Sequence, residues 1–113
     1  MGRVVYVEES GVEWRVSPPK PGMPVDNPGV RAKFLTAGSD EIPRVLLAEY
    51  EAGHTEPRHK HREAELLYVL DGEATIEATT IRPGMLVYVE GSTEYGPVVS
   101  GPAGIRFLRI EVR

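Results

Sequence analysis

The chain has 113 residues, a formal net charge of −4 and no cysteine. The absence of cysteine excludes disulfides, zinc–thiolate sites, iron–sulfur clusters and a cysteine nucleophile, and the acidic balance is a poor match for nucleic acid or anionic lipid. Hydrophobic residues make up 41% of the chain, as in one ordinary globular domain, and 12 glycines and 10 prolines favour turns and short strands over long helices.

The first 29 residues predict an N-terminal hairpin followed by an arm. Residues 4–7 and 12–16 are short β-branched runs with a turn at Ser10-Gly11 between them, so we expect two paired strands. Residues 17–29 contain five prolines, which exclude helix and disfavour sheet. This segment is predicted either as an extended arm that packs on the barrel or on a partner, or as a disordered linker, and residues 30–113 form the main domain.

The middle of the chain predicts a run of strands. Short apolar runs bounded by turn residues are found at 30–35, 44–51, 65–70 and 73–79. Asp71-Gly72 is the favoured pair for a two-residue type I′ turn, so we expect the last two of these strands to form a hairpin. Residues 54–62 are polar and are predicted as a loop that enters a strand.

The last third of the chain predicts three more strands, at 85–89, 98–99 and 105–112, and the first of them is expected to be buried. In the closing strand Leu108, Ile110 and Val112 share one face. With about eight to ten short strands, a turn signal every 8–12 residues or so and no convincing helix, the expected fold is an all-β sandwich or barrel.

All three histidines of the chain lie within eight consecutive residues. In a strand, side chains two apart point the same way, so His59 and His61 converge on one face and Glu65 shares their parity. Two imidazoles and one carboxylate suit a catalytic divalent metal, non-haem iron in particular, although imidazole also suits Zn, Ni, Cu and Mn. The alternative is a solvated polar loop. The apolar strand that follows favours a metal site, as do the small side chains of Ala74 and Ala78, which leave room for a cavity.

The spacing from Gly53 through His59, His61 and Glu65 to Gly72 agrees at every defined position with the first cupin motif. The chain therefore resembles a small single-domain cupin, a family of double-stranded β-helix (jelly-roll) barrels that bind a metal in their interior. The resemblance implies that His59, His61 and Glu65 are metal ligands.

The second cupin motif is only partly present. It begins at Gly84, but Glu90, Ser92 and Tyr95 stand where the family has a proline, a glycine and a last histidine ligand. Tyr95 is then a phenolate ligand, a hydrogen-bond or proton donor beside an open coordination position, or a cap on the mouth of the barrel. The candidate metal ligands are His59, His61, Glu65 and Tyr95, and the candidate catalytic residues are Glu65 and Tyr95.

The resemblance implies a metal-dependent enzyme that acts on a small molecule. Its reaction is either dioxygenase chemistry on a chelating ketone or diketone, or isomerase-type proton transfer, with a divalent transition metal (Fe ahead of Mn, Zn or Ni). One alternative is a non-catalytic module that binds a metal or small ligand for sensing, and another is a structural barrel whose site has decayed.

The sequence also predicts where the protein acts and with what partners. Its longest apolar runs have five residues, against the roughly 20 that span a bilayer, and Glu8 comes too early for a secretory signal. We therefore expect a cytoplasmic protein without membrane or nucleic-acid partners. The open sheet edges of a small barrel predict a homodimer.

Overall fold

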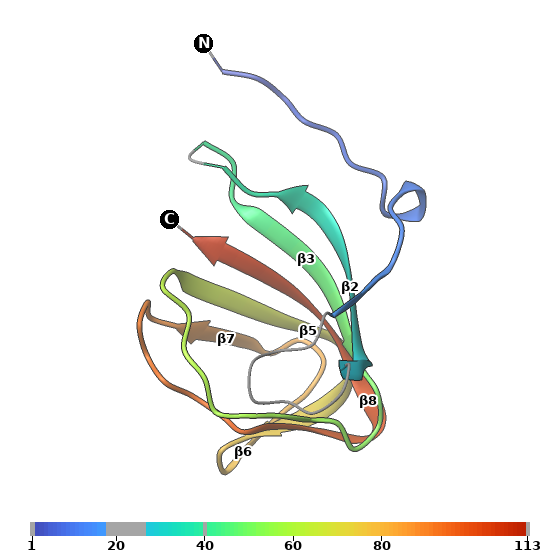
Figure 1. The fold of residues 1–113 in the computed structure, drawn as a ribbon, viewed down its shortest axis with the longest axis vertical. Helices are drawn as coiled ribbons and strands as arrows, with labels where there is room; N and C mark the ends of the chain where they lie inside the picture. The colour runs from blue at the N-terminus through green and yellow to red at the C-terminus, as the bar shows by residue number, and fades with distance from the viewer. Residues whose placement is uncertain (1, 18–26, 40, 113) are drawn as a thin grey trace.

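Figure 1 shows the computed structural model of the chain, which describes residues 2–17, 27–39 and 41–112. Strands dominate, with one 3-10 turn at Glu9–Gly11, and no helix in these ranges is long and apolar enough to cross a membrane. The all-β prediction is confirmed. The strands are β1 Arg15–Ser17, β2 Asn27–Ala37, β3 Arg44–Tyr50, β4 Thr55–Glu56, β5 Ala64–Ile76, β6 Thr79–Ile81, β7 Leu86–Val89 and β8 Val98–Val112.

Within the described residues, the strands form one antiparallel sheet of eight, in which β1, β2, β3, β8, β5 and β6 follow one another, with β4 paired to β8 and β7 to β5. The two long strands, β5 and β8, pair along most of their length. The first half of β5 also pairs with β7 and its end with β6, while β8 pairs with β4 at its start and with β3 further on. These two strands therefore carry the sheet around the barrel interior (Figure 1).

The predicted hairpin at Asp71-Gly72 is wrong, because β5 runs unbroken through both residues. Gly72 has a φ of 72° and pairs with Ile105 on β8, with register shifts on both sides. Such shifts are β-bulges, which bend a strand. A Cβ at Gly72 would overlap the carbonyl oxygen of Gly104. Gly72 therefore allows β5 to bend at a point where it packs closely against β8.

The turn lies a few residues later, at Glu77 and Ala78, between β5 and β6. Ala78 is exposed there, so the expectation that it lines the cavity is wrong, whereas Ala74 is buried in the core. The strands predicted at 98–99 and 105–112 are one strand of 15 residues. The strand predicted as buried at 85–89 exposes Leu86 and Tyr88 on its outer face.

The predicted N-terminal hairpin is also wrong. Residues 4–7 form no strand and are exposed, and the blue N-terminal end of the ribbon in Figure 1 runs away from the sheet. Trp14 instead packs on the outside of β2, where the guanidinium of Arg31 lies 4.0 Å from its ring centre and the Lys33 Nζ lies 5.0 Å from it. β2 crosses the boundary predicted after residue 29, and residues 18–26 of the predicted arm lie outside the described residues.

Apolar side chains cover part of the outer surface of the sheet. Leu66 pairs with Tyr88 and Tyr68 with Leu86, so these four share one face. Tyr68, Leu86 and Tyr88 are 42%, 59% and 58% exposed. Because contiguous exposed apolar patches mark interaction surfaces, this is the face on which we expect a second copy to pack, and the homodimer stays a prediction.

We expect the purified chain to have the mass of a dimer in size-exclusion chromatography with light scattering. Leu86→Glu should shift it to the monomer, because the substitution places a charge in the apolar patch. Val4→Glu changes a still more exposed apolar residue outside the patch and should leave the mass unchanged. A monomeric wild-type chain would contradict the prediction.

Candidate functional site

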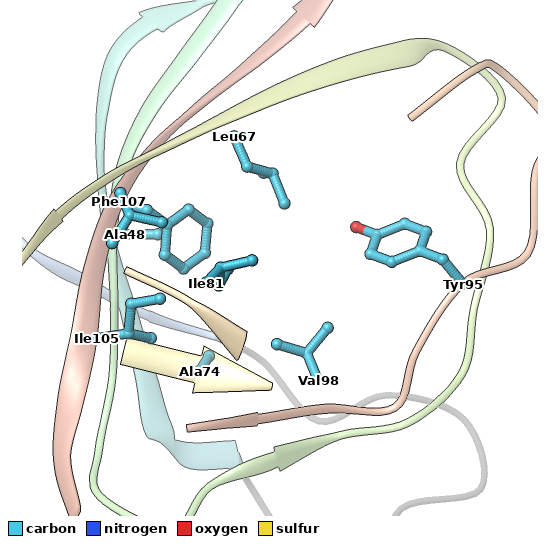
Figure 2. Close-up of a cluster of buried hydrophobic side chains, with 9 residues drawn as sticks. Ala48, Leu67, Ala74, Ile81, Tyr95, Val98, Ile105 and Phe107 are labelled. Carbon is cyan, nitrogen blue, oxygen red and sulfur yellow. The ribbon is translucent and has the colours of Figure 1, made fainter. Parts of the chain in front are cut away.

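The barrel encloses a cavity of about 470 Å³. Much of its lining is apolar and includes Ala48, Leu67, Ile81, Val98, Ile105 and Phe107. Figure 2 shows these side chains with Tyr95, whose hydroxyl points into the interior from the loop that precedes β8. Polar side chains form the rest of the lining, among them His59, His61, Tyr95, Arg109 and Glu111.

The two histidines are brought together by a loop. His59 and Tyr95 form an isolated bridge in which each backbone N–H donates to the other residue's carbonyl, at 3.0 and 2.9 Å. The carbonyl of His61 accepts the backbone N–H of Ser92 at 2.7 Å. The ring centres of His59 and His61 are 4.8 Å apart. The expected convergence of the histidines is therefore found, but it depends on pairing between distant loops instead of on strand parity.

Glu65 lies at the start of β5 and is only 1% exposed. Its Oε2 accepts a hydrogen bond from Arg109 Nε at 2.6 Å, and its Oε1 accepts one from the Tyr95 hydroxyl. The Nε2 of His61 is 3.9 Å from the same Oε2. Both carboxylate oxygens are thus engaged by donors of the protein itself.

Sequence reasoning missed Arg109, which is central to this cluster. Its Nη2 lies 3.0 Å from His61 Nδ1 and donates to Glu111 Oε1 at 3.1 Å. Burial acts to lower the pKa of Arg109, but attraction to Glu65, the hydrogen bond to it and the charge of Glu111 raise the pKa above its usual value. The guanidinium is therefore a permanent positive charge inside the barrel.

The alternation of side chains along the last strand placed Arg109 on the face opposite Leu108, Ile110 and Val112, and this was the signal that could have found it. Leu108 and Ile110 do share a face with Val112, as predicted, but the cavity is lined by the opposite face, with Arg109 and Glu111. The apolar face of this strand lies on the outside of the barrel. Alternation alone separates the two faces without telling which one is interior.

Tyr95 keeps its proton in this environment. Burial raises the pKa of the Tyr95 hydroxyl, and the hydrogen bond to Glu65 raises it further. Its ring centre is 4.8 Å from that of His59. Of the three roles considered for Tyr95, the hydrogen-bond donor agrees best with this contact.

His59 presents a free lone pair because its other ring nitrogen is occupied. His59 Nδ1 lies 2.7 Å from the carbonyl oxygen of Pro57. A carbonyl oxygen only accepts hydrogen bonds, so Nδ1 carries the proton and Nε2 holds the lone pair in the neutral ring. Since His59 lines the cavity, this nitrogen can accept a proton or bind a metal.

His54 and Glu56 lie in the segment predicted as a polar loop, but Glu56 is not exposed to solvent. Glu56 is buried and lines the cavity, and its Oε2 lies 3.2 Å from His54 Nε2. The ring of His54 packs edge-on against Tyr50, with 5.0 Å between centres. Burial raises the pKa of the Tyr50 hydroxyl, so Tyr50 is a neutral part of the cavity wall.

The residues, as they are placed, do not fit a transition-metal ion. Within residues 2–17, 27–39 and 41–112, no three His, Cys, Asp or Glu side chains are arranged to hold one. Both oxygens of Glu65 are occupied, and the positive charge of Arg109 contacts both Glu65 and His61. A divalent cation at the same position would be repelled by that charge. Of the four candidate ligands, Glu65 and His61 contact Arg109, and the Tyr95 hydroxyl donates to Glu65. Metal binding stays a prediction.

Comparisons with known proteins identify the fold. The cupin domain family model matches residues 46–111. Similar solved structures include an RmlC-like cupin from Ralstonia eutropha, with a TM-score of 0.77, 18% identity and coverage of 97% of this chain and 69% of that one. A sugar phosphate isomerase of the cupin superfamily from Silicibacter pomeroyi has a TM-score of 0.78 and 19% identity. The match covers 96% of this chain and 76% of that one.

A third similar structure is the Rhodobacter sphaeroides SigE complex with the anti-sigma ChrR. Its TM-score is 0.68 and its identity 25%, and the match covers 93% of this chain and 51% of that one. No curated protein sequence matches the chain significantly. These similarities confirm the jelly-roll barrel that the resemblance to the cupin family implied.

Proposed function

The chain belongs to the cupin family, and from this premise we propose that it is a cytoplasmic enzyme that moves a proton on a small carbonyl compound. One observation carries the proposal: a proton acceptor, His59, a neutral hydroxyl donor, Tyr95, and a fixed positive charge, Arg109, line the same cavity. Cupins commonly bind metals, and the similar structures include a protein named as an isomerase. In this chain we assign to the positive charge of Arg109 the stabilisation of negative charge on the substrate that a metal ion would otherwise supply.

In the proposed reaction, Nε2 of His59 removes a proton from the carbon beside the carbonyl group. The electron pair of the C–H bond forms the double bond of an enolate, whose oxygen is stabilised by the Tyr95 hydroxyl and the Arg109 guanidinium. The protonated His59 then returns the proton to the carbon that lost it, which restores the carbonyl group, or, in a hydroxyketone, to the former carbonyl carbon while the hydroxyl proton passes to the first carbonyl oxygen. No co-reactant is consumed in either case. Glu65 is the positioning residue, because it binds both Tyr95 and Arg109.

The cavity indicates what kind of substrate fits. A volume of about 470 Å³ lies in the range of ordinary small-molecule sites. Leu67, Ile81 and Phe107 line it beside the polar cluster. We propose a substrate with a small apolar body and one carbonyl group that faces the polar cluster.

The test is hydrogen exchange of candidate substrates in D₂O, followed by proton NMR over a panel of ketones, hydroxyketones and diketones. We expect the wild-type protein to exchange the proton beside the carbonyl of at least one compound. His59→Ala should slow this exchange by about 100-fold or more, since it removes the base. Tyr95→Phe should slow it by a similar factor, since it removes a donor to the enolate oxygen.

Lys60→Ala is the matched control, because Lys60 lies in the same loop with its side chain exposed, and it should keep the wild-type rate. Exchange that survives His59→Ala would overturn the assignment of the base. A compound that binds in the cavity without any exchange would point instead to a non-catalytic binding or sensing module.

The complete motif from Gly53 to Gly72 favours a second candidate, a metal-dependent enzyme. Here His59, His61 and Glu65 would hold Fe, Mn, Zn or Ni with Tyr95 beside them, and iron would suit a dioxygenase reaction on a chelating ketone or diketone. Arg109 would first have to leave Glu65. Oxygen consumption by the Fe(II)-loaded protein with such a compound, and its loss in His61→Ala, would favour this candidate.

A further inference from the structure

We propose that Arg109 is the resident cation of this site and that it competes with any divalent metal ion for Glu65 and His61. The inference concerns metal affinity and does not rest on the proposed proton transfer. It begins from the contrast between a complete first cupin motif and a site in which a guanidinium contacts two of the three residues that the motif assigns to the metal.

The buried carboxylate of Glu65 already has its charge balanced by Arg109. Glu65 is almost fully buried, and a buried carboxylate needs a cation or several hydrogen bonds to offset its desolvation. Arg109 supplies the charge at 2.6 Å, and Tyr95 supplies a second hydrogen bond. A metal ion at Glu65 would therefore have to displace donors that already meet this need.

The strand pairing places Arg109 beside Glu65. On the paired strands β5 and β8, Glu65 is opposite Glu111, and Leu67 is opposite Arg109. Arg109 is therefore the diagonal neighbour of Glu65 on the same inner face, within reach of a long side chain. β8 is also held by β3 on its other side, where Arg109 pairs with Leu46.

Arg109 is also held by a second carboxylate, that of Glu111. Its Nη2 donates to Glu111, which also forms an ion pair with Arg44 at 3.7 Å. The guanidinium thus lies between two carboxylates, and its release would leave both without this partner. We expect this double attachment to keep Arg109 in the site in the absence of substrate.

The experiment is titration of the 113-residue chain with Co(II), followed by visible absorption and calorimetry, with Zn(II) as a competing ion. The wild-type protein should bind Co(II) weakly. Arg109→Met removes the charge at similar length and should bind one equivalent about 10- to 100-fold more tightly, which is the usual range of coupling between two sites. Adding His61→Ala to Arg109→Met should remove the gain.

Arg44→Met is the matched control, because Arg44 also lines the cavity and pairs with Glu111, and it should bind Co(II) as weakly as the wild type. Should Arg109→Met fail to fold, Arg109→Gln provides the same measurement with a polar side chain. Stoichiometric, tight Co(II) binding by the wild-type protein would overturn the proposal. Equal affinities of wild type and Arg109→Met, or a gain that survives His61→Ala, would also overturn it.

Discussion

Glu65→Ala is expected to lower the free energy of unfolding by about 3–5 kcal/mol, the cost of breaking a buried ion pair from one side. The substitution leaves Arg109 with Glu111 as its remaining acidic neighbour at 3.1 Å, and it removes the acceptor of the buried Tyr95 hydroxyl. A buried donor without an acceptor adds to the loss. Urea denaturation followed by circular dichroism measures the change as a shift of the midpoint.

Two comparisons separate this effect from a general loss of packing. Glu65→Ala combined with Arg109→Met should cost at least about 1 kcal/mol less than the sum of the single variants, since the pair is coupled. Glu94→Ala removes a carboxylate whose side chain is 62% exposed and lies 3.7 Å from Arg58, and it should cost less than about 1 kcal/mol. Strictly additive single variants would show that the Glu65–Arg109 pair is not coupled.

Gly72→Ala is expected to destabilise the barrel by at least about 3 kcal/mol, near the upper end for single substitutions. The positive φ of 72° is unfavourable for alanine by about 1–2 kcal/mol. A methyl group there would also overlap the Gly104 carbonyl oxygen, and backbone paired in the centre of the sheet cannot easily move away. Urea denaturation measures the loss, and reduced soluble expression would accompany it.

Gly84→Ala is the matched control for the steric part of this prediction. Gly84 has a φ of 87°, and a Cβ there would meet no atom within 4 Å. We expect it to cost about 1–2 kcal/mol, from the backbone conformation alone. Equal unfolding midpoints for the two variants would contradict the proposed close approach of β5 and β8.

The amino-acid sequence by itself determined the fold class and indicated the position of the candidate site. The density of turn residues and the short apolar runs indicated an all-β barrel, because these signals depend on each residue's own backbone preferences. The spacing from Gly53 to Gly72 located the cluster of His59, His61 and Glu65 at the entrance to β5. Both inferences needed only local patterns, and so they did not require the partner strands.

The tertiary structure alone decided whether Asp71-Gly72 forms a turn or lies within a strand, and which side chains face inward. A glycine with positive φ serves a hairpin turn and a bulge equally well, and only the pairing with Ile105 distinguishes them. Alternation divides the last strand into two faces but does not tell which face is interior. Arg109 lies on the interior face, where it pairs with Glu65 and Glu111. Pairing between distant segments depends on contacts that no local pattern contains.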